Sequence, residues 1–332
     1  MRTGRLVSLL LSGVAAASLL TGCGSIDKNA TVATLDGTNV PLGVANFAAR
    51  LEQANADDFY QAYGFGPDVW SSDLYGSGTT IEEDTKESVM ESLYDMYVLN
   101  AHAADYGVEL TEEQKTAIAD AAAGFVSDNT PEALAAIGAD QATVEEYLTL
   151  LTIQRGMRTA IIAETDTNVS DEEAATGSYS YVRVSKLSYT DETGSTVEYT
   201  EEDLPELLAT VEEFAAKAKK DGLAASVEEY GYTVNSGTFR EGDEFVDEVV
   251  LPVLLAADEG EVSDVIDTEG SYYVVCVDAK MDEAATEQTR QNLISERENA
   301  HYDEVLEGFK AQHTWEVKKG VWNRVSFRNL FT

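Results

Sequence analysis

The side chains best suited to acid–base or metal chemistry are few and far apart in this sequence. Histidine occurs three times, at His102, His301 and His313. The surrounding patterns predict helices around His102 and His301, and His313 follows just beyond the second helix. No HExxH, CxxC or phosphate-loop glycine pattern accompanies them. We therefore expect helix-surface or packing roles for all three, and neither a metal site nor a cofactor.

One acidic segment has some features of a calcium loop. The stretch DTNVSDEE (166–173) places oxygen-bearing side chains at alternate positions. It lacks the glycine and the distal glutamate of an EF-hand. Ser170, followed three residues later by Glu173, instead has the spacing of a helix start. We expect a helix N-terminus at Ser170.

The two cysteines predict different chemistry. Cys276 lies in the apolar run YYVVCV, where a small buried core residue is expected and a reactive thiol is the alternative. Cys23 ends the stretch LTGC, which follows two arginines and an apolar run over 6–20. An uncleaved membrane helix would need about 20 apolar residues, and the run here is shorter.

This N-terminal pattern resembles the lipobox of bacterial lipoproteins. The resemblance implies a signal peptide over 1–22, lipidation of Cys23, and a short tether over 23–30. Two acyl chains anchor a protein stably where one does not. We therefore expect an extracytoplasmic protein, lipid-anchored to the bacterial cell membrane.

Composition restricts the classes of partner. The chain has 22 Lys and Arg against 61 Asp and Glu, a formal net charge of −39. This charge repels phosphate backbones, so nucleic acid is not an expected partner. With 332 residues, of which 44% are hydrophobic, the chain is long enough for two domains.

The first half of the chain has helical periodicity. Asp36-Gly37, between two short apolar runs, predicts a β-hairpin. Helices are expected over 42–63, 84–107 and 142–163, and Thr111 has the spacing of a capping box that opens another.

A glycine-rich loop interrupts these helices over 64–80. It carries Phe65, Trp70 and Tyr75. We expect these aromatic residues to pack the loop onto its own domain, and contact with an apolar substrate is the alternative.

The second half changes period. The stretch YSYVRVSKLSY (179–189) alternates as a strand does, and a hairpin partner follows it. Helices are predicted over 202–220, 224–230 and 246–257, then a strand ending near 278. A long helix over 283–311 and an extended segment close the chain.

Several of these stretches resemble one family. The segment 237–278, GTFREGDEFVDEVVLPVLLAADEGEVSDVIDTEGSYYVVCVD, is similar to the C-terminal half of a parvulin domain. NVSDEE resembles the linker that precedes such domains, and ATLDGTNVPL resembles the start of the SurA-like chaperone region. Together with the lipobox, the chain resembles PrsA-like foldase lipoproteins.

The resemblance implies an α+β fold. A mostly helical chaperone region over 31–170 would be completed by a C-terminal helix and strand over 283–332. A parvulin-like domain over 178–281, a small antiparallel sheet with helices, would be inserted between them. The implied function is that of a folding factor that binds unfolded or newly exported polypeptides. A solute-binding lipoprotein is an alternative, but the helical first half lacks the repeated βαβ units of those folds.

The resemblance also implies site residues for peptidyl-prolyl isomerisation, which is slow because of the amide barrier. The family's two histidines fall on Lys186 and Tyr273, and its loop Cys or Asp falls near Thr233. The proline socket falls on Val246 and Val250, one helical turn apart.

No histidine occurs between residues 178 and 281. The family's histidine pair is therefore absent under any alignment. Lys186 is expected to be a solvent-facing charge on its strand. Weak or absent isomerase activity is the first expectation, and an active isomerase with a non-standard site is the alternative.

Overall fold

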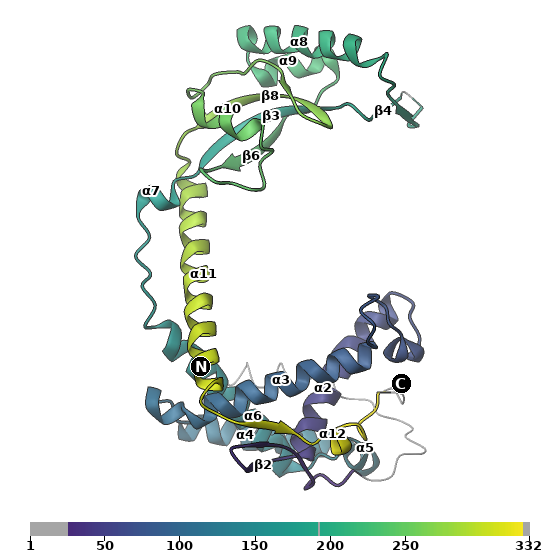
Figure 1. Ribbon diagram of the computed structural model, residues 1–332, viewed down its shortest axis with the longest axis vertical. Helices are drawn as coiled ribbons and strands as arrows, with labels where there is room; N and C mark the ends of the chain where they lie inside the picture. Colours follow the sequence, from purple (N-terminus) through teal and green to yellow (C-terminus); the bar gives the residue numbers. More distant parts are fainter. Residues whose placement is uncertain (1–25, 192, 328–332) are drawn as a thin grey trace. The chain divides into compact units, whose positions relative to one another are not determined.

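The computed structural model describes residues 26–191 and 193–327 (Figure 1). The expected signal peptide and Cys23 lie outside these residues. The chain divides into two compact units. The helical unit comprises the chain up to Thr165 and again from Glu298, and the mixed unit spans Asp166–Arg297. The helical unit is thus discontinuous in sequence.

The helical unit is built mainly from long helices. Its elements are β1 (Thr31–Leu35), β2 (Thr38–Pro41), α2 (Leu42–Ala62), the 3-10 turn η1 (Pro67–Ser71), α3 (Ile81–Ala101), the 3-10 turn η2 (Ala103–Tyr106), α4 (Glu112–Asp128), α5 (Pro131–Ile137), α6 (Gln141–Ile162), the second half of α11 (Glu283–Lys310), β9 (Trp315–Val317) and α12 (Lys319–Trp322). Capping boxes at Thr80 and Thr111 open α3 and α4, and the second of these was predicted.

A three-stranded sheet joins the two sequence segments of this unit. Its order is β2-β1-β9. The predicted hairpin is present, since β1 and β2 pair antiparallel. Asp36 and Gly37 at its turn both have positive φ, at 48° and 82°, as a tight turn of this kind requires. Strand β9 pairs antiparallel with β1, so that Ala33 faces Val317.

The chain beyond β9 differs from the extended segment that was predicted. It turns into the short helix α12, which buries Trp322 in the core of the unit. Burial of Trp322 and Val325, which are 5% and 1% exposed, favours this turn of the chain onto the core.

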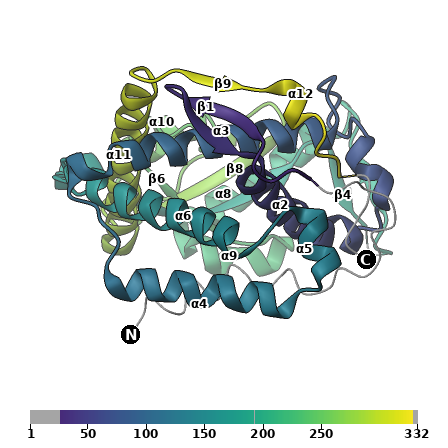
Figure 2. The same ribbon diagram turned by 90° about the horizontal axis from the view of Figure 1, so that it is seen from below.

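The core of the helical unit is aromatic at its centre. In the helical unit, α6 packs against α2, α3 and α4 (Figure 2). The ring of Phe47 meets those of Phe125 and Tyr147 edge to face, at centroid distances of 5.3 and 5.4 Å. Trp70 is buried, as expected for the loop 64–80. It lies edge to face with Phe327, at 4.8 Å.

The mixed unit combines a small sheet with short helices. Its elements are α7 (Asp171–Ala174), β3 (Gly177–Ser185), β4 (Ser188–Thr190), β5 (Thr196–Glu198), α8 (Leu204–Asp221), α9 (Leu223–Tyr230), β6 (Asn235–Phe239), α10 (Val250–Ala256), β7 (Ile266–Asp267), β8 (Ser271–Ala279) and the first half of α11. The main sheet is antiparallel, in the order β6-β3-β8-β7, and β4 and β5 form a separate hairpin. The α+β prediction is confirmed, and Ser170 caps α7 as predicted.

The two faces of this sheet bury different clusters. Val182 and Val184 of β3 pack with Phe214 of α8 on one face. Tyr179 of β3 packs with Val250 of α10 on the other face. Alternate residues of a strand point to opposite faces, so the odd and even positions of β3 serve different clusters. The face with Phe214 is called the α8 face below, and the face with Val250 is called the α10 face.

Glycine is required at two positions of the sheet where an aromatic ring lies close to the backbone. A Cβ at Gly177 would lie 2.5 Å from the ring of Phe239, and one at Gly237 would lie 2.8 Å from the ring of Tyr179. These separations are far shorter than carbon contacts allow.

Among the residues that the structure describes, no helix has the length and apolar character needed to cross a membrane.

Candidate functional site

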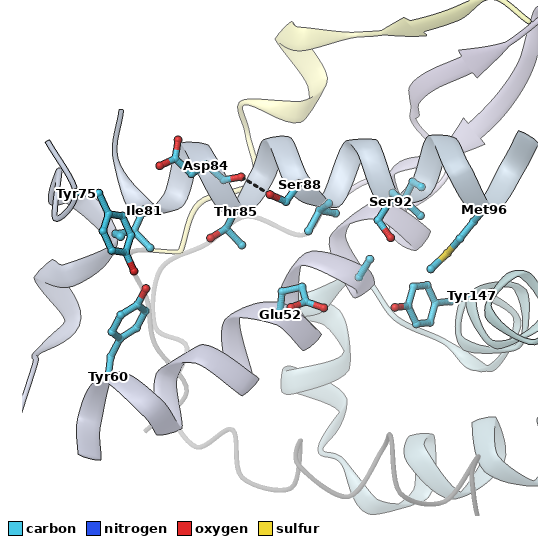
Figure 3. Close-up of a pocket in the computed structure, with 13 residues that line it drawn as sticks. Glu52, Tyr60, Tyr75, Ile81, Asp84, Thr85, Ser88, Ser92, Met96 and Tyr147 are labelled. Atoms are coloured by element: carbon cyan, nitrogen blue, oxygen red, sulfur yellow. Dashed lines mark hydrogen bonds between the residues drawn. The ribbon is translucent and has the colours of Figure 1, made fainter. Parts of the chain in front are cut away.

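A pocket opens in the helical unit between α2, α3 and α6. Its volume is about 410 Å³. In Figure 3, Tyr60 and Tyr75 stand at one end of the pocket, and Met96 and Tyr147 stand at the other. The walls are apolar and hydroxyl-bearing side chains with two carboxylates, namely Ala48, Glu52, Tyr60, Tyr75, Ile81, Asp84, Thr85, Ser88, Val89, Ser92, Leu93, Met96 and Tyr147.

The sequence of α3 explains why this space stays open. Ile81, Thr85, Ser88, Ser92 and Met96 follow one another at intervals of three or four residues, so they share one face of the helix. The three central side chains are small. Larger apolar side chains there would fill the groove and close it.

The described residues that line the pocket include acidic side chains but no basic one. Glu52 and Asp84 supply the carboxylates. Burial raises the pKa of Tyr147 to about 12 and also raises the pKa of Tyr60. Both phenols are therefore protonated at neutral pH and available as hydrogen-bond donors. The pocket favours a ligand that combines apolar surface with positive charge or amide groups.

Exposed aromatic side chains lie beside this pocket. We call Phe59, Tyr63, Phe65 and Tyr75 the aromatic patch. Phe59, Tyr63 and Tyr75 are 58%, 70% and 73% exposed. The ring centroids of Phe59 and Tyr63 lie 4.7 Å apart. The ring of Phe65 packs edge to face on Tyr60, which lines one end of the pocket. A contiguous group of exposed aromatic rings is a candidate interaction surface.

The loop 64–80 therefore has two roles. Trp70 packs it onto the helices, as expected, while Phe65 and Tyr75 remain exposed. The pocket was not predicted. Its signal in the sequence is the run of small hydroxyl residues on one face of α3, but which helices oppose that face is a tertiary property.

In the mixed unit, three of the five residues implied by the family resemblance lie together. Val246, Val250 and Tyr273 all belong to the cluster on the α10 face of the sheet. Val246 and Val250 were predicted to lie one turn apart on a helix. This prediction is wrong, because α10 begins only at Val250. Pro252 is tolerated only in the first turn of a helix, which places the start of α10 close to it.

Lys186 lies on the other side of the sheet. Its ammonium group pairs with Asp267 and lies 4.7 Å above the ring of Tyr272, which belongs to the α8 face. Its side chain is only 14% exposed, so it is not the solvent-facing charge that was expected. Lys186 and Tyr273 therefore do not face each other.

Thr233 is also separate from the α10 face. It is exposed and lines a different cavity of about 890 Å³, beside the β4–β5 hairpin and α8. The aromatic residues that line that cavity are tyrosines, and the ring centroids of Tyr189 and Tyr199 lie 4.9 Å apart.

Tyr181, which was not predicted, lies beside Tyr273 on the α10 face, where the family resemblance had implied Lys186. Its ring is 6.0 Å from Tyr273 and stacks on Tyr179 at 5.3 Å. The period-two alternation of β3 puts these rings on the α10 face. Burial raises the pKa of Tyr273, against the opposing effect of Arg183. The α10 face thus offers a half-buried, tyrosine-rich apolar surface and no histidine.

Comparisons with known proteins return structures but no sequence family. No family model and no curated protein matches the chain. The foldase protein PrsA from Streptococcus pneumoniae is 18% identical, with 76% of this chain and 96% of that chain covered and a TM-score of 0.31. The PrsA foldase from Lactococcus lactis is 13% identical, with 88% of this chain and 96% of that chain covered and a TM-score of 0.36. A structure from a study of the SurA-like chaperones PEB4 and Cj1289 of Campylobacter jejuni is 11% identical. It covers 87% of this chain and 99% of that chain, with a TM-score of 0.30.

These are the same two groups of proteins that the sequence motifs resemble.

Proposed function

We propose that this protein is an extracytoplasmic folding factor, tethered to the membrane through Cys23, that holds apolar and aromatic segments of unfolded exported polypeptides. The observation that supports the proposal is the aromatic patch, which continues into the pocket between α2, α3 and α6. This is also the function that the motif resemblance implies.

The size of the pocket suits side chains rather than a folded partner. Its volume of about 410 Å³ is at the low end for small-ligand pockets, so it accommodates one or two side chains of an extended segment. The hydroxyl groups of Thr85, Ser88 and Ser92 can pair with the segment's backbone amides. Such contacts do not depend on one client sequence.

The energetics favour weak, reversible binding. Burying one aromatic side chain removes roughly 150–250 Å² from water, worth roughly 4–6 kcal/mol before costs. The loss of translational and conformational freedom offsets much of this. A client held by one or two side chains can therefore leave and fold.

Charge selects among clients. The chain's net charge of −39 and the carboxylates of Glu52 and Asp84 favour segments with Lys or Arg next to apolar residues. Strongly acidic segments are repelled. Added salt should weaken the charged component of binding and leave the apolar component in place.

The membrane tether is a separate part of the proposal. It is supported by LTGC at the end of the apolar run. Cell fractionation after metabolic labelling with a fatty acid tests it. Labelled protein in the membrane fraction is expected, and the Cys23→Ala variant should be unlabelled. Label retained in that variant would contradict the tether without affecting client binding.

An aggregation assay tests client binding. The full chain without its lipid, added at stoichiometric amounts to an unfolding client, should reduce light scattering. Ser92→Trp fills the pocket from α3, leaves the aromatic patch in place, and should weaken the effect. Ser127→Trp makes the same change at an exposed position of α4 and should retain it. No suppression by the wild type, or equal suppression by Ser92→Trp, would overturn the proposal.

A further inference from the structure

Two of the three histidines meet in the helical unit, although 211 positions separate them in sequence. The Nε2 atoms of His102 and His313 lie 3.0 Å apart. His102 caps the C-terminal end of α3, and His313 lies in the connection between α11 and β9. The contact joins the N-terminal and C-terminal segments of the unit.

Each histidine is held from behind by a carboxylate. His102 Nδ1 lies 2.9 Å from Oδ2 of Asp105, and His313 Nδ1 lies 2.6 Å from Oδ2 of Asp36. The backbone N–H of Thr314 donates to the other oxygen of Asp36, over 2.7 Å. Both outer nitrogens therefore face carboxylate oxygens, so a neutral ring at either position carries its N–H at Nδ1.

The rings themselves are packed in place. His102 stacks on Phe309 with centroids 3.9 Å apart and planes within 8° of parallel. The side chains of His102 and His313 are only 14% and 16% exposed. The two imidazoles cannot turn away from each other without losing these contacts.

This arrangement leaves a site for a cation. A neutral imidazole carries one N–H. If each N–H points at its carboxylate, two Nε2 lone pairs face each other across 3.0 Å. Such a pair repels unless a cation lies between the two atoms, either a proton that makes one ring an imidazolium donor or a metal ion that both rings bind. Metal-ligating histidines show the same pattern, in which the outer N–H donates to a carboxylate and the other nitrogen binds the metal.

We infer that His102 and His313 form a two-histidine site for a divalent transition metal of the zinc class. Two nitrogens at about 2.0–2.1 Å from a tetrahedral zinc lie roughly 3.3–3.4 Å apart, so the observed pair needs to open by only a few tenths of an ångström. Imidazole ligands suit Zn²⁺, Cu²⁺ and Ni²⁺, and do not suit Ca²⁺ or Mg²⁺.

Water completes the coordination. Among the residues that the structure describes, no group of three or more His, Cys, Asp or Glu is placed to hold a metal. The site therefore supplies two protein ligands, with Asp105 and Asp36 orienting them. A metal bound there ties the C-terminal end of α3 to the segment that leads into β9, and stabilises the folded helical unit by mass action.

Titration of the full, chelator-treated chain with ZnCl₂ tests the site. Calorimetry should show one zinc site per chain, and the thermal midpoint should rise with Zn²⁺ concentration. His102→Gln and His313→Gln should each lose both signals. His301→Gln, which changes the third histidine, should retain them. CaCl₂ at the same concentrations should give neither signal.

A milder variant covers the case in which the histidine variants do not fold. Asp105 is largely exposed and is not a ligand, so Asp105→Asn should fold and bind Zn²⁺ about 10–100-fold more weakly. The inference is overturned if the wild type shows no zinc-dependent shift, if CaCl₂ gives an equal shift, or if Asp105→Asn binds zinc as the wild type does.

Discussion

The indole N–H of Trp70 donates to Oδ1 of Asp57 across 2.8 Å, inside the helical unit. Both residues are buried, at 1% and 4% exposure. The second carboxylate oxygen of Asp57 has no hydrogen-bond partner among the described residues. This bond connects the loop 64–80, which carries part of the aromatic patch, to the helix α2 that forms one wall of the pocket.

Asp57 should make stability depend on pH. Burial raises the pKa of Asp57 above its ordinary 3.8, and the bond from Trp70 opposes this only in part. Above pH 3.8 the folded state then keeps a proton that the unfolded state has lost, so the contribution of Asp57 to stability falls as pH rises through the raised pKa. Asp57→Asn keeps an acceptor for Trp70 and cannot ionise.

Urea unfolding at several pH values measures the effect. The free energy of unfolding of the wild type minus that of Asp57→Asn should decrease from about pH 3.8 upward, then level off. A difference that is constant with pH, or that increases, would show that the carboxylate of Asp57 is not destabilised by burial.

Phe327 should anchor the C-terminal segment. Its ring is fully buried against Trp70, and its carbonyl accepts from Gln53 Nε2 over 3.2 Å. Removing a buried phenylalanine ring costs about 3–5 kcal/mol, so Phe327→Ala should lower the free energy of unfolding by that amount. Leu187→Ala, at a position 70% exposed, is the control and should change it by less than about 0.5 kcal/mol. A loss for Phe327→Ala no larger than the control's would rule out this anchoring role.

Gly237 should tolerate no side chain. A Cβ there meets the ring of Tyr179 at 2.8 Å, whereas a Cβ at Gly270 meets nothing within 4 Å. Gly237→Ala should destabilise the mixed unit by about 1–3 kcal/mol through overpacking, and Gly270→Ala should not. The two variants are compared by thermal or urea unfolding, and equal midpoints would contradict the packing of Tyr179 on β6.

The mixed unit should not accelerate prolyl isomerisation appreciably. The α10 face offers Val246, Val250, Tyr181 and Tyr273, and the sequence has no histidine between residues 178 and 281. In a protease-coupled assay on X-Pro peptides, the rate with protein should equal the uncatalysed rate. An acceleration that disappears in Val246→Asp would instead support an isomerase with a tyrosine-based site.

Local structure could be predicted from the sequence, because local chemistry determines it. The Asp36-Gly37 turn, the capping box at Thr111 and the cap at Ser170 all appear as expected. The face on which Lys186 lies could not be obtained from a family alignment, because a shift of one residue in a strand moves a side chain to the opposite face.

Features formed by distant segments could not be predicted. The pocket requires α2, α3 and α6 to meet, and no sequence period specifies which helices oppose one another. The contact between His102 and His313 depends on the pairing of β9 with β1, which brings the C-terminal segment beside the Asp36-Gly37 turn.

Site-specific photo-crosslinking tests the central claim most directly. A photo-reactive residue at position 92, in the pocket wall on α3, is compared with one at position 127, on the exposed side of α4. With an unfolded client present, we predict crosslinks from position 92 that a native client does not give, and few from position 127. Equal crosslinking from both positions, or none from position 92, would contradict binding in this pocket.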